Sequence, residues 1–228
     1  MSVLGTGAVA IWHDISPQGR DEFYAWHGEE HMPERVGVPG FLRSSRYMAV
    51  EASPQFFILH EAATFAVLVS PDYQASLNHP TPRTLAISPH FRNAVRSLCH
   101  VAASFGQARA GLIATLRYDI TCTPEKHRAA MMNEIIPALR RSPVVSAAHF
   151  LIADPDASAL ETAERRARSG NDAAPGWVLL VESWGDSGTL QSFCDEELSL
   201  SMRKQAGAGG SKHGLYRLQA TLSQSGAS

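Results

Sequence analysis

The pattern of apolar and polar positions predicts the same order of strands and helices twice along the chain. Apolar runs of strand length alternate with stretches of helical period. In the first part they predict strand 7–15, helix 17–32, strands 41–50 and 56–63, helix 70–77 and strand 93–105. In the second part they predict strand 111–120, helix 124–139, strands 144–153 and 177–184, helix 187–200 and strand 213–222. Each part therefore has the order βαββαβ, which is that of the ferredoxin-like split unit.

Matching residues at a constant spacing support a duplication. Pro33 and Pro39 recur as Pro137 and Pro143, which gives an offset of 104 for both pairs (137 minus 33 and 143 minus 39). The predicted third strands carry the similar runs ILHE and LLVE. A repeat of this length is too long for a solenoid, and it indicates two copies of one domain.

The fold class that follows is α+β, with two tandem ferredoxin-like βαββαβ modules at residues 1–108 and 109–223. Each module has an apolar sheet face that the other must cover. Residues 154–175 are extra length in the second module, and their charge predicts a surface excursion with a short helix. Residues 224–228 are predicted to form a disordered tail.

The repeat makes the second module a control for the first. Apolar residues at helical spacing in the helix of the second module are Met131, Ile135, and Ala138 or Leu139. Their counterparts in the first module are His27, His31, and Glu34 or Arg35. An imidazole buried without a partner costs about 1–3 kcal/mol. The two histidines therefore predict a polar pocket between the first helix and its sheet.

Other ionisable residues of the first module extend this candidate site. His60 stands where the second module has Val181, inside the apolar run FFILHEAA. We assign acid/base catalysis to His31 with His60 as its partner, one imidazole neutral and the other protonated. Glu30 is the third candidate catalytic residue, as a group that orients one imidazole. Its counterpart Glu134 lacks such neighbours, so a structural role for Glu30 stays open.

Substrate binding is assigned to residues that surround these three in the predicted elements. Arg46 or Arg35 would stabilise an enolate or a carboxylate. The further candidates for binding are His27, Tyr47 and His13. A zinc site is an alternative interpretation, because the run HGEEH (residues 27–31) fits the pattern H-x-x-E-H. Gly28 within that pattern and Pro33 just after it argue against zinc, and we predict no metal.

Composition narrows the function classes. The formal net charge is −2 and no basic stripe occurs, so we expect no nucleic-acid partner. Apolar runs are shorter than the roughly 20 residues of a membrane helix, and the N-terminal stretch lacks the features of a signal peptide. Three widely spaced cysteines argue against a disulfide framework. We expect a cytoplasmic protein.

One part of the sequence resembles a known group of proteins. The runs EEHMPERVGVPGFLRSSRY (Glu29–Tyr47), SPDY (Ser70–Tyr73) and NHPTPRT (Asn78–Thr84) are similar to those of the dimeric α/β-barrel superfamily, in particular to EthD-related small bacterial proteins. That group places a histidine two residues before a proline, as His31 stands before Pro33. Relatives carry an aromatic residue at the position of His27.

The resemblance implies that the sheets of the two modules join into one barrel within the chain. It also implies enzymes of several kinds, namely isomerases, cyclases, cofactor-free monooxygenases and haem enzymes. We favour a cofactor-independent acid/base enzyme (isomerase, cyclase or dehydratase) acting on a small carbonyl- or lactone-containing, aromatic metabolite. The alternatives are a non-catalytic binding or accessory protein, and a haem-dependent or cofactor-free oxidative enzyme. A homodimer stays open.

Overall fold

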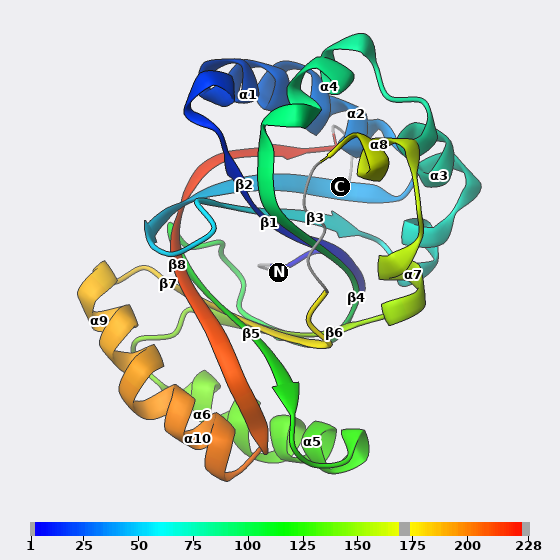
Figure 1. Cartoon of the computed structure of the whole chain (residues 1–228). Coiled ribbons are helices and arrows are strands. Elements are labelled where there is room, and N and C mark those ends of the chain that lie inside the picture. Colours follow the sequence, from blue (N-terminus) through cyan, green and yellow to red (C-terminus); the bar gives the residue numbers. More distant parts are fainter. Residues whose placement is uncertain (1–2, 169–173, 225–228) are drawn as a thin grey trace.

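Eight antiparallel strands close into a barrel at the centre of the molecule (Figure 1). The computed structural model describes residues 3–168 and 174–224. The strands are β1 (Gly7–Ile15), β2 (Phe41–Glu51), β3 (Phe56–Ala62), β4 (Phe91–Phe105), β5 (Leu112–Ile120), β6 (Ala147–Ala153), β7 (Trp177–Ser183) and β8 (Ala208–Ser223). Their order around the barrel is β1-β3-β2-β8-β5-β7-β6-β4.

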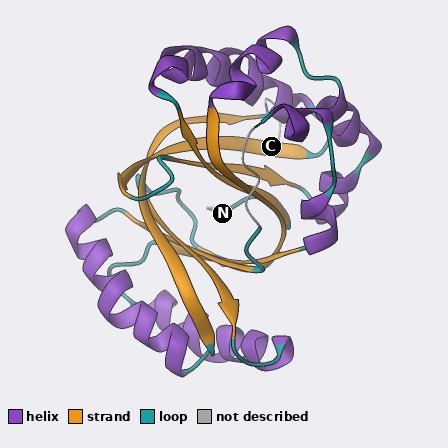
Figure 2. Ribbon diagram, in the orientation of Figure 1, coloured by secondary structure: helices purple, strands orange, loops and turns teal. Residues whose placement is uncertain are grey.

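Two groups of helices lie outside the barrel, at opposite ends of Figure 2. The first group contains α1 (Arg20–Trp26), α2 (Met32–Gly37), α3 (Pro71–Asn78), α4 (Pro82–Ile87), α7 (Pro155–Ala159) and α8 (Ala163–Ala167). The second group contains α5 (Pro124–Ala130), α6 (Ile136–Arg141), α9 (Ser187–Ser192) and α10 (Ser199–Lys204). The 3-10 turns are η1 (Pro17–Gly19), η3 (Phe65–Val69) and η4 (Ser88–His90), and the π-helical turns are η2 (His27–His31), η5 (Met131–Ile135) and η6 (Phe193–Leu198).

The strand order is the same in the two parts of the chain. The first four strands run β4-β1-β3-β2, and the last four run β8-β5-β7-β6. Two seams join the parts, where β2 pairs with β8 and β4 pairs with β6. The predicted α+β class and the barrel are confirmed. In the antiparallel pair of β1 and β3, Ile11 lies opposite Ile58 and Val9 lies opposite His60.

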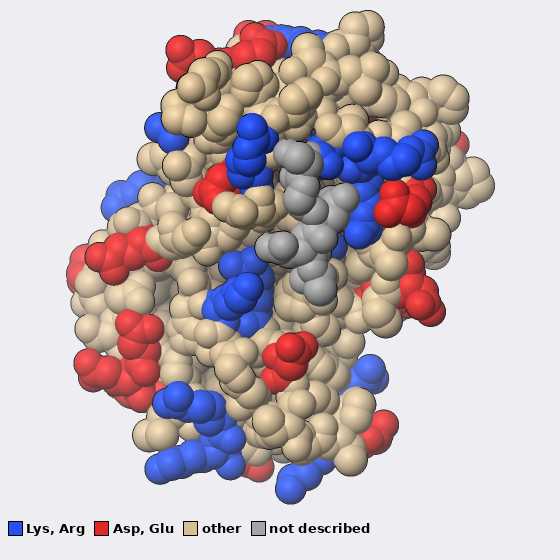
Figure 3. Space-filling view, in the orientation of Figure 1, with Lys and Arg blue, Asp and Glu red and all other residues tan. Residues whose placement is uncertain are grey.

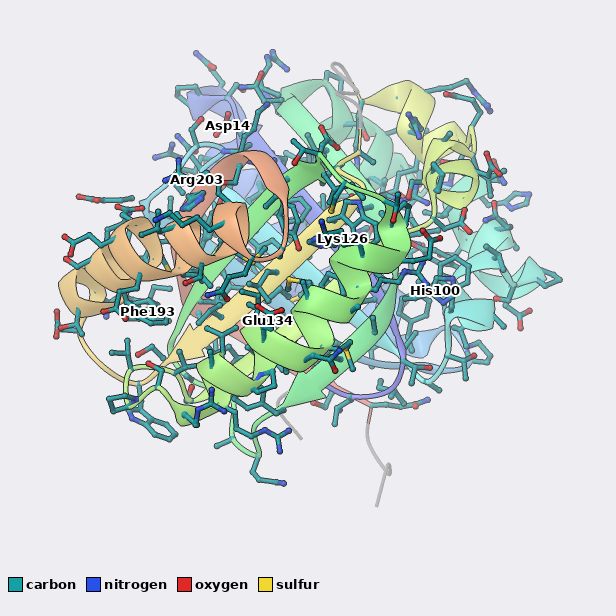
Figure 4. The ribbon with its side chains drawn as sticks, turned by 90° about the horizontal axis from the view of Figure 1, so that it is seen from below. Asp14, His100, Lys126, Glu134, Phe193 and Arg203 are labelled. Carbon is teal, nitrogen blue, oxygen red and sulfur yellow. The ribbon has the colours of Figure 1, made fainter. Side chains whose placement is uncertain are left out.

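Strands β1, β3, β5, β6 and β7 are buried on both faces over most of their length, which explains why their sequences are mostly apolar. Inside the barrel, the core contains large side chains such as Trp12, Phe57 and Tyr216. Outside it, the second group of helices covers β5 to β8 with a filled apolar core that includes Met131 and Ile135. Figure 4 shows these helices lying across the strands, with the exposed Lys126 and Glu134 labelled on them.

The same irregular turn interrupts the first helix of each part. Residues His27–His31 and Met131–Ile135 both form a π-helical turn, at the offset of 104 found in the sequence. Pro33 and Pro137 each follow two residues later. A proline removes a backbone donor and crowds the preceding turn, so a widened turn accommodates it.

Three features differ from the prediction. The short helix α4 was not predicted, because its six residues show no apolar period; Thr81 caps it by accepting a hydrogen bond from the Thr84 amide at 3.0 Å. Strand β8 begins at Ala208 rather than at 213, within a glycine-rich stretch that predicts a loop. The described part of the predicted excursion, residues 154–168, forms two short helices instead of one; α7 contacts β4, and α8 contacts α3 and α4. The predicted tail 224–228 lies outside the described residues except for Gln224.

Charged side chains on the surface are mixed in sign. On the face drawn in Figure 3, lysine and arginine side chains lie in small groups among aspartate and glutamate side chains. No helix of the described residues is long and apolar enough to cross a membrane.

Candidate functional site

A cavity of about 320 Å³ lies under the first group of helices, on the outer face of β1, β3 and β4. The turn η2 and the helices α2 and α3 form one wall, and α7 with α8 forms the other. The lining residues are Ile11, His31, Arg35, His60, Tyr73, Leu77, Ala94, Arg96, Pro155, Ser158, Ala159, Glu164, Arg165, Arg168 and Ala174. The predicted pocket of the first half is therefore present, and three of the predicted residues (His31, His60 and Arg35) line it.

His31 is held at the end of η2 with little freedom. Its ring stacks on Trp26, with ring centroids 4.3 Å apart, and only 4% of the residue is exposed. The Nδ1 atom lies 3.7 Å from a carboxylate oxygen of Glu34, which is too far for a hydrogen bond. Burial, together with the nearby charge of Arg35, lowers the pKa of His31 below its usual value. The ring is therefore neutral near pH 7 and able to accept a proton.

His60 faces His31 from the neighbouring strand β3. The ring centroids are 6.0 Å apart, and His60 Nδ1 shares a hydrogen bond of 2.9 Å with the Ser44 hydroxyl. Burial, and next the repulsion between the charged forms of His60 and His31, lowers the pKa of His60 well below its usual value. The two histidines converge as predicted. Burial disfavours the charged form of both, which argues against the predicted pairing of one neutral and one protonated imidazole.

An ion cluster links the first half to the excursion from the second half. The Arg35 Nη2 atom donates to Glu164 Oε2 at 2.7 Å, and Arg168 donates to the other oxygen of Glu164. Arg35 Nη1 also donates to the Ser76 hydroxyl at 2.8 Å. Burial alone would raise the pKa of the Glu164 carboxyl, but Arg168 and Arg35 lower it well below its usual value. Glu164 is therefore ionised and holds two guanidinium groups.

Neither Glu164 nor Arg168 was among the predicted site residues. Both lie in a charged stretch without apolar period, and Glu164 contacts Arg35 across 129 residues of sequence. The buried position of Arg35, at the place of an apolar residue in the other half, was the signal that a partner existed. The identity of that partner had no local signature.

His27 and His13 lie beside the cavity rather than in its wall. Together with His31 and His60 they line a small void of about 10 Å³. His27 is buried, and among the described residues neither of its ring nitrogens has a hydrogen-bond partner. His13 packs among Phe23, Phe56 and Phe91. Burial lowers the pKa of His13 to about 3.

Glu30 supports the site from outside. Its carboxylate accepts a hydrogen bond from the Thr81 hydroxyl and a long one, 3.5 Å, from the Thr84 hydroxyl. Thr84 also accepts a hydrogen bond of 3.1 Å from the Trp26 indole, on which His31 stacks. The structure does not place Glu30 in the cavity wall. Its hydrogen bonds to two threonine hydroxyls favour the structural role that the sequence left open.

Arg46 and Tyr47 are not brought to the cavity either. Arg46 lies over the rings of Tyr24 and Phe23, with its guanidinium carbon 4.9 and 5.7 Å from their centroids. Tyr47 points into the barrel, where its hydroxyl accepts a hydrogen bond of 3.0 Å from Arg109. Consecutive residues of a strand point to opposite faces, so both could not line one pocket.

The site residues do not form a metal centre. Among residues 3–168 and 174–224, no group of three or more His, Cys, Asp or Glu side chains could hold a metal ion. Glu30, the glutamate of the H-x-x-E-H pattern, is engaged with Thr81. The cavity volume of about 320 Å³ is at the low end of the roughly 300–1,000 Å³ typical of small-molecule sites, which favours a ligand smaller than haem. Among the described residues, His31 Nδ1 has no hydrogen-bond acceptor of the kind that usually orients an axial histidine, and the Glu34 carboxylate lies 3.7 Å away.

Comparisons with known proteins define the fold. No family model and no curated protein matches the chain. Among solved structures, the chain is similar to an anthrone oxidase-like protein, with 12% identity over 96% of this chain and 93% of the other and a TM-score of 0.62. It is also similar to a candidate monooxygenase from Lactobacillus acidophilus NCFM (10% identity, 96% and 97% of the chains, TM-score 0.58).

A third similar structure is a mutant chlorite dismutase from Candidatus Nitrospira defluvii in complex with cyanide, with 9% identity over 95% of this chain and 92% of the other and a TM-score of 0.55. At these identities the likeness establishes the fold alone. The chain is thus an α+β protein with an eight-stranded antiparallel barrel like those structures.

Proposed function

We propose that the chain is an enzyme that removes a proton from carbon in a small carbonyl-containing metabolite. The observation that carries this proposal is a neutral, oriented imidazole, His31, in the wall of a cavity whose other wall is rich in guanidinium groups. A base needs the neutral ring, and the enolate that forms needs positive charge. At the same place in the second half lies an apolar core, which provides neither a base nor a positive charge.

The proposed reaction begins when His31 accepts the proton from the carbon next to the carbonyl group. The bond electrons move toward the carbonyl oxygen, where the guanidinium groups of the cavity stabilise the negative charge. His31, now protonated, returns the proton to a different atom of the substrate, which gives isomerisation or cyclisation. His60 and Trp26 hold the ring of His31 in place during both transfers.

A second candidate shares the first step. A carbanion formed by His31 could add O₂ and take up a proton to give a hydroperoxide, which loses water to leave a new carbonyl group. This sequence converts a CH₂ group and O₂ to C=O and water without a bound cofactor. The similar structures described as an anthrone oxidase-like protein and a candidate monooxygenase favour this route.

Solvent deuterium exchange tests the proton transfer without knowledge of the natural substrate. Phenylpyruvate has an acidic CH₂ group beside a carbonyl, and ¹H NMR in D₂O follows the loss of its CH₂ signal. We expect the protein to accelerate this loss, and His31→Gln to reduce the acceleration by about 10²–10⁴-fold. The exposed His79 provides the matched control His79→Gln, which should exchange normally. Equal rates for His31→Gln and the unchanged protein would rule out His31 as the base.

We also propose that residues 1–108 and 109–223 are two copies of one ferredoxin-like module, related to the EthD group. The equal strand orders and the π-helical turns at an offset of 104 support this. Two buried glutamates add to the likeness. Glu61 accepts a hydrogen bond of 2.7 Å from the Leu4 amide, and Glu182 accepts one of 2.8 Å from the Ala110 amide, just before β1 and β5 respectively.

A further inference from the structure

The four arginines that line the cavity differ in the hydrogen-bond acceptors and carboxylates that the protein provides for their guanidinium groups. Arg35 and Arg168 both bind Glu164. Arg165 donates to the Ser158 carbonyl at 2.6 Å, and its Nε atom lies 3.5 Å from Glu161. Each of these three guanidinium groups therefore has an oxygen acceptor and a carboxylate nearby.

Arg96, on strand β4, is different. Its Nε and Nη2 atoms are buried, and neither has a hydrogen-bond partner in the part of the chain that the structure describes. These two N–H groups form one edge of the guanidinium group, and that edge can hold both oxygens of a carboxylate. A buried charge without such compensation is costly. The described residues supply no acceptor for this edge of Arg96.

The charge balance of the cavity agrees with this. The carboxylates of the cluster are Glu34, which lies 3.7 Å from Arg35, together with Glu161 and Glu164. Four arginines against three carboxylates leave one positive charge in excess among the described residues. Glu164 also attracts Arg96 electrostatically, but its two oxygens already bind Arg35 and Arg168, so among the described residues the excess falls on the Arg96 side chain.

The rest of the wall indicates what accompanies a negative group. Apolar and aromatic side chains of the lining are Ile11, Tyr73, Leu77, Ala94, Pro155 and Ala159. Such surfaces favour a hydrocarbon or an aromatic ring. A volume of about 320 Å³ fits one ring with a short substituent rather than a long chain.

We infer that the cavity binds a small aromatic or compact apolar molecule that carries one carboxylate, and that the Nε–Nη2 edge of Arg96 holds this carboxylate. The body of the molecule lies against Ile11 and Leu77, within reach of His31. This inference rests on the proposed function in that it names the substrate class of the same cavity. Its test concerns binding alone and needs no turnover.

The test compares benzoate with benzamide, which has almost the same shape but no charge. Isothermal titration calorimetry measures both affinities on the unchanged protein, on Arg96→Gln and on Arg141→Gln. Arg141 is exposed on α6 of the second half, so its variant loses the same charge far from the cavity. We expect benzoate to bind at least about tenfold more tightly than benzamide, since charged hydrogen bonds are the stronger ones.

Arg96→Gln should weaken benzoate binding by about 10–100-fold and leave benzamide binding unchanged, whereas Arg141→Gln should change neither. Arg96→Lys, which keeps the charge but loses the two-pronged edge, should fall in between. Equal affinities for the two ligands, equal losses of both in Arg96→Gln, or no binding of either up to about 10 mM would each overturn the inference.

The two proposals fail separately. His31→Gln should keep the preference for benzoate, because the carboxylate contacts Arg96. A protein that prefers benzoate through Arg96 but does not exchange the phenylpyruvate protons would refute the proposed function and leave the carboxylate site. A protein that exchanges the protons but shows no preference for benzoate would do the reverse.

Discussion

The substitution His31→Ile restores the residue that the second half carries at Ile135, and it should separate stability from activity. In the folded protein, His31 is buried with an unbonded Nδ1 atom, which costs about 1–3 kcal/mol. The substitution also loses the stacking on Trp26, which contributes about 0.5–1.5 kcal/mol. The difference predicts a variant that is more stable by about 1 kcal/mol. For a chain of this length, the melting temperature should rise by about 2–4 °C.

The reciprocal substitution Ile135→His is the matched control. Ile135 is buried in the apolar core under the second group of helices, and it does not line the cavity of the first half. An unpaired imidazole there should cost about 2–4 kcal/mol, from the lost apolar contact and the unbonded nitrogens together. Its melting temperature should fall by roughly 5–15 °C.

Thermal unfolding by circular dichroism and the phenylpyruvate exchange rate, measured on the same samples, give both quantities. His31→Ile should keep or raise the melting temperature while the exchange rate falls by about 10²–10⁴-fold. A loss of about 2 kcal/mol or more in His31→Ile, with normal exchange, would show that His31 serves packing. The reasoning from the repeat would then be refuted.

Three further predictions concern stability. Burial lowers the pKa of His13 from 6.5 to about 3, so on acidification the unfolded chain binds this proton before the folded chain does. In urea unfolding, the free energy of unfolding should therefore fall below pH 6.5 by about 1.4 kcal/mol per pH unit for this group. A flat profile from pH 7 to 5 would contradict this prediction. Glu164→Gln should lower the free energy of unfolding by about 3–5 kcal/mol in the same assay, because it leaves buried guanidinium groups uncompensated. Glu161→Gln, at an exposed carboxylate, should lower it by about 1 kcal/mol or less. Equal losses for the two variants would contradict the role of Glu164 in the ion cluster. Residues 1–108 alone expose the seam edges of β2 and β4 and should self-associate in size-exclusion chromatography, so a stable monomer of that fragment would count against the closed barrel.

The fold was largely predictable because its signals are local. Five of the eight strands (β1, β3, β5, β6 and β7) are buried on both faces over most of their length, so apolar runs of strand length mark them without knowledge of the partner strand. The position of His31 was also predictable, because the second half shows what the same helical position carries when it only packs.

The remainder of the site depends on long-range contacts. Arg96 lies in a strand with mixed polar and apolar residues, and its role appears only when α7 and α8 enclose the cavity. Glu164 meets Arg35 from the other half of the chain. Glu30 is adjacent to His31 in sequence but on a different side of the helix, which turns by about 100° per residue. Sequence proximity therefore grouped residues that the fold separates.

The most direct test of the central claim, that His31 and His60 are neutral bases in a ligand cavity, is the ¹H–¹⁵N NMR spectrum of their imidazole rings. In protein labelled with ¹⁵N-histidine, both rings should show the neutral form at pH 7, and benzoate should shift their signals. His127 and His149, buried in the second half, should not respond to benzoate. Protonated signals for His31 and His60 at pH 7, or benzoate shifts confined to histidines of the second half, would contradict the account.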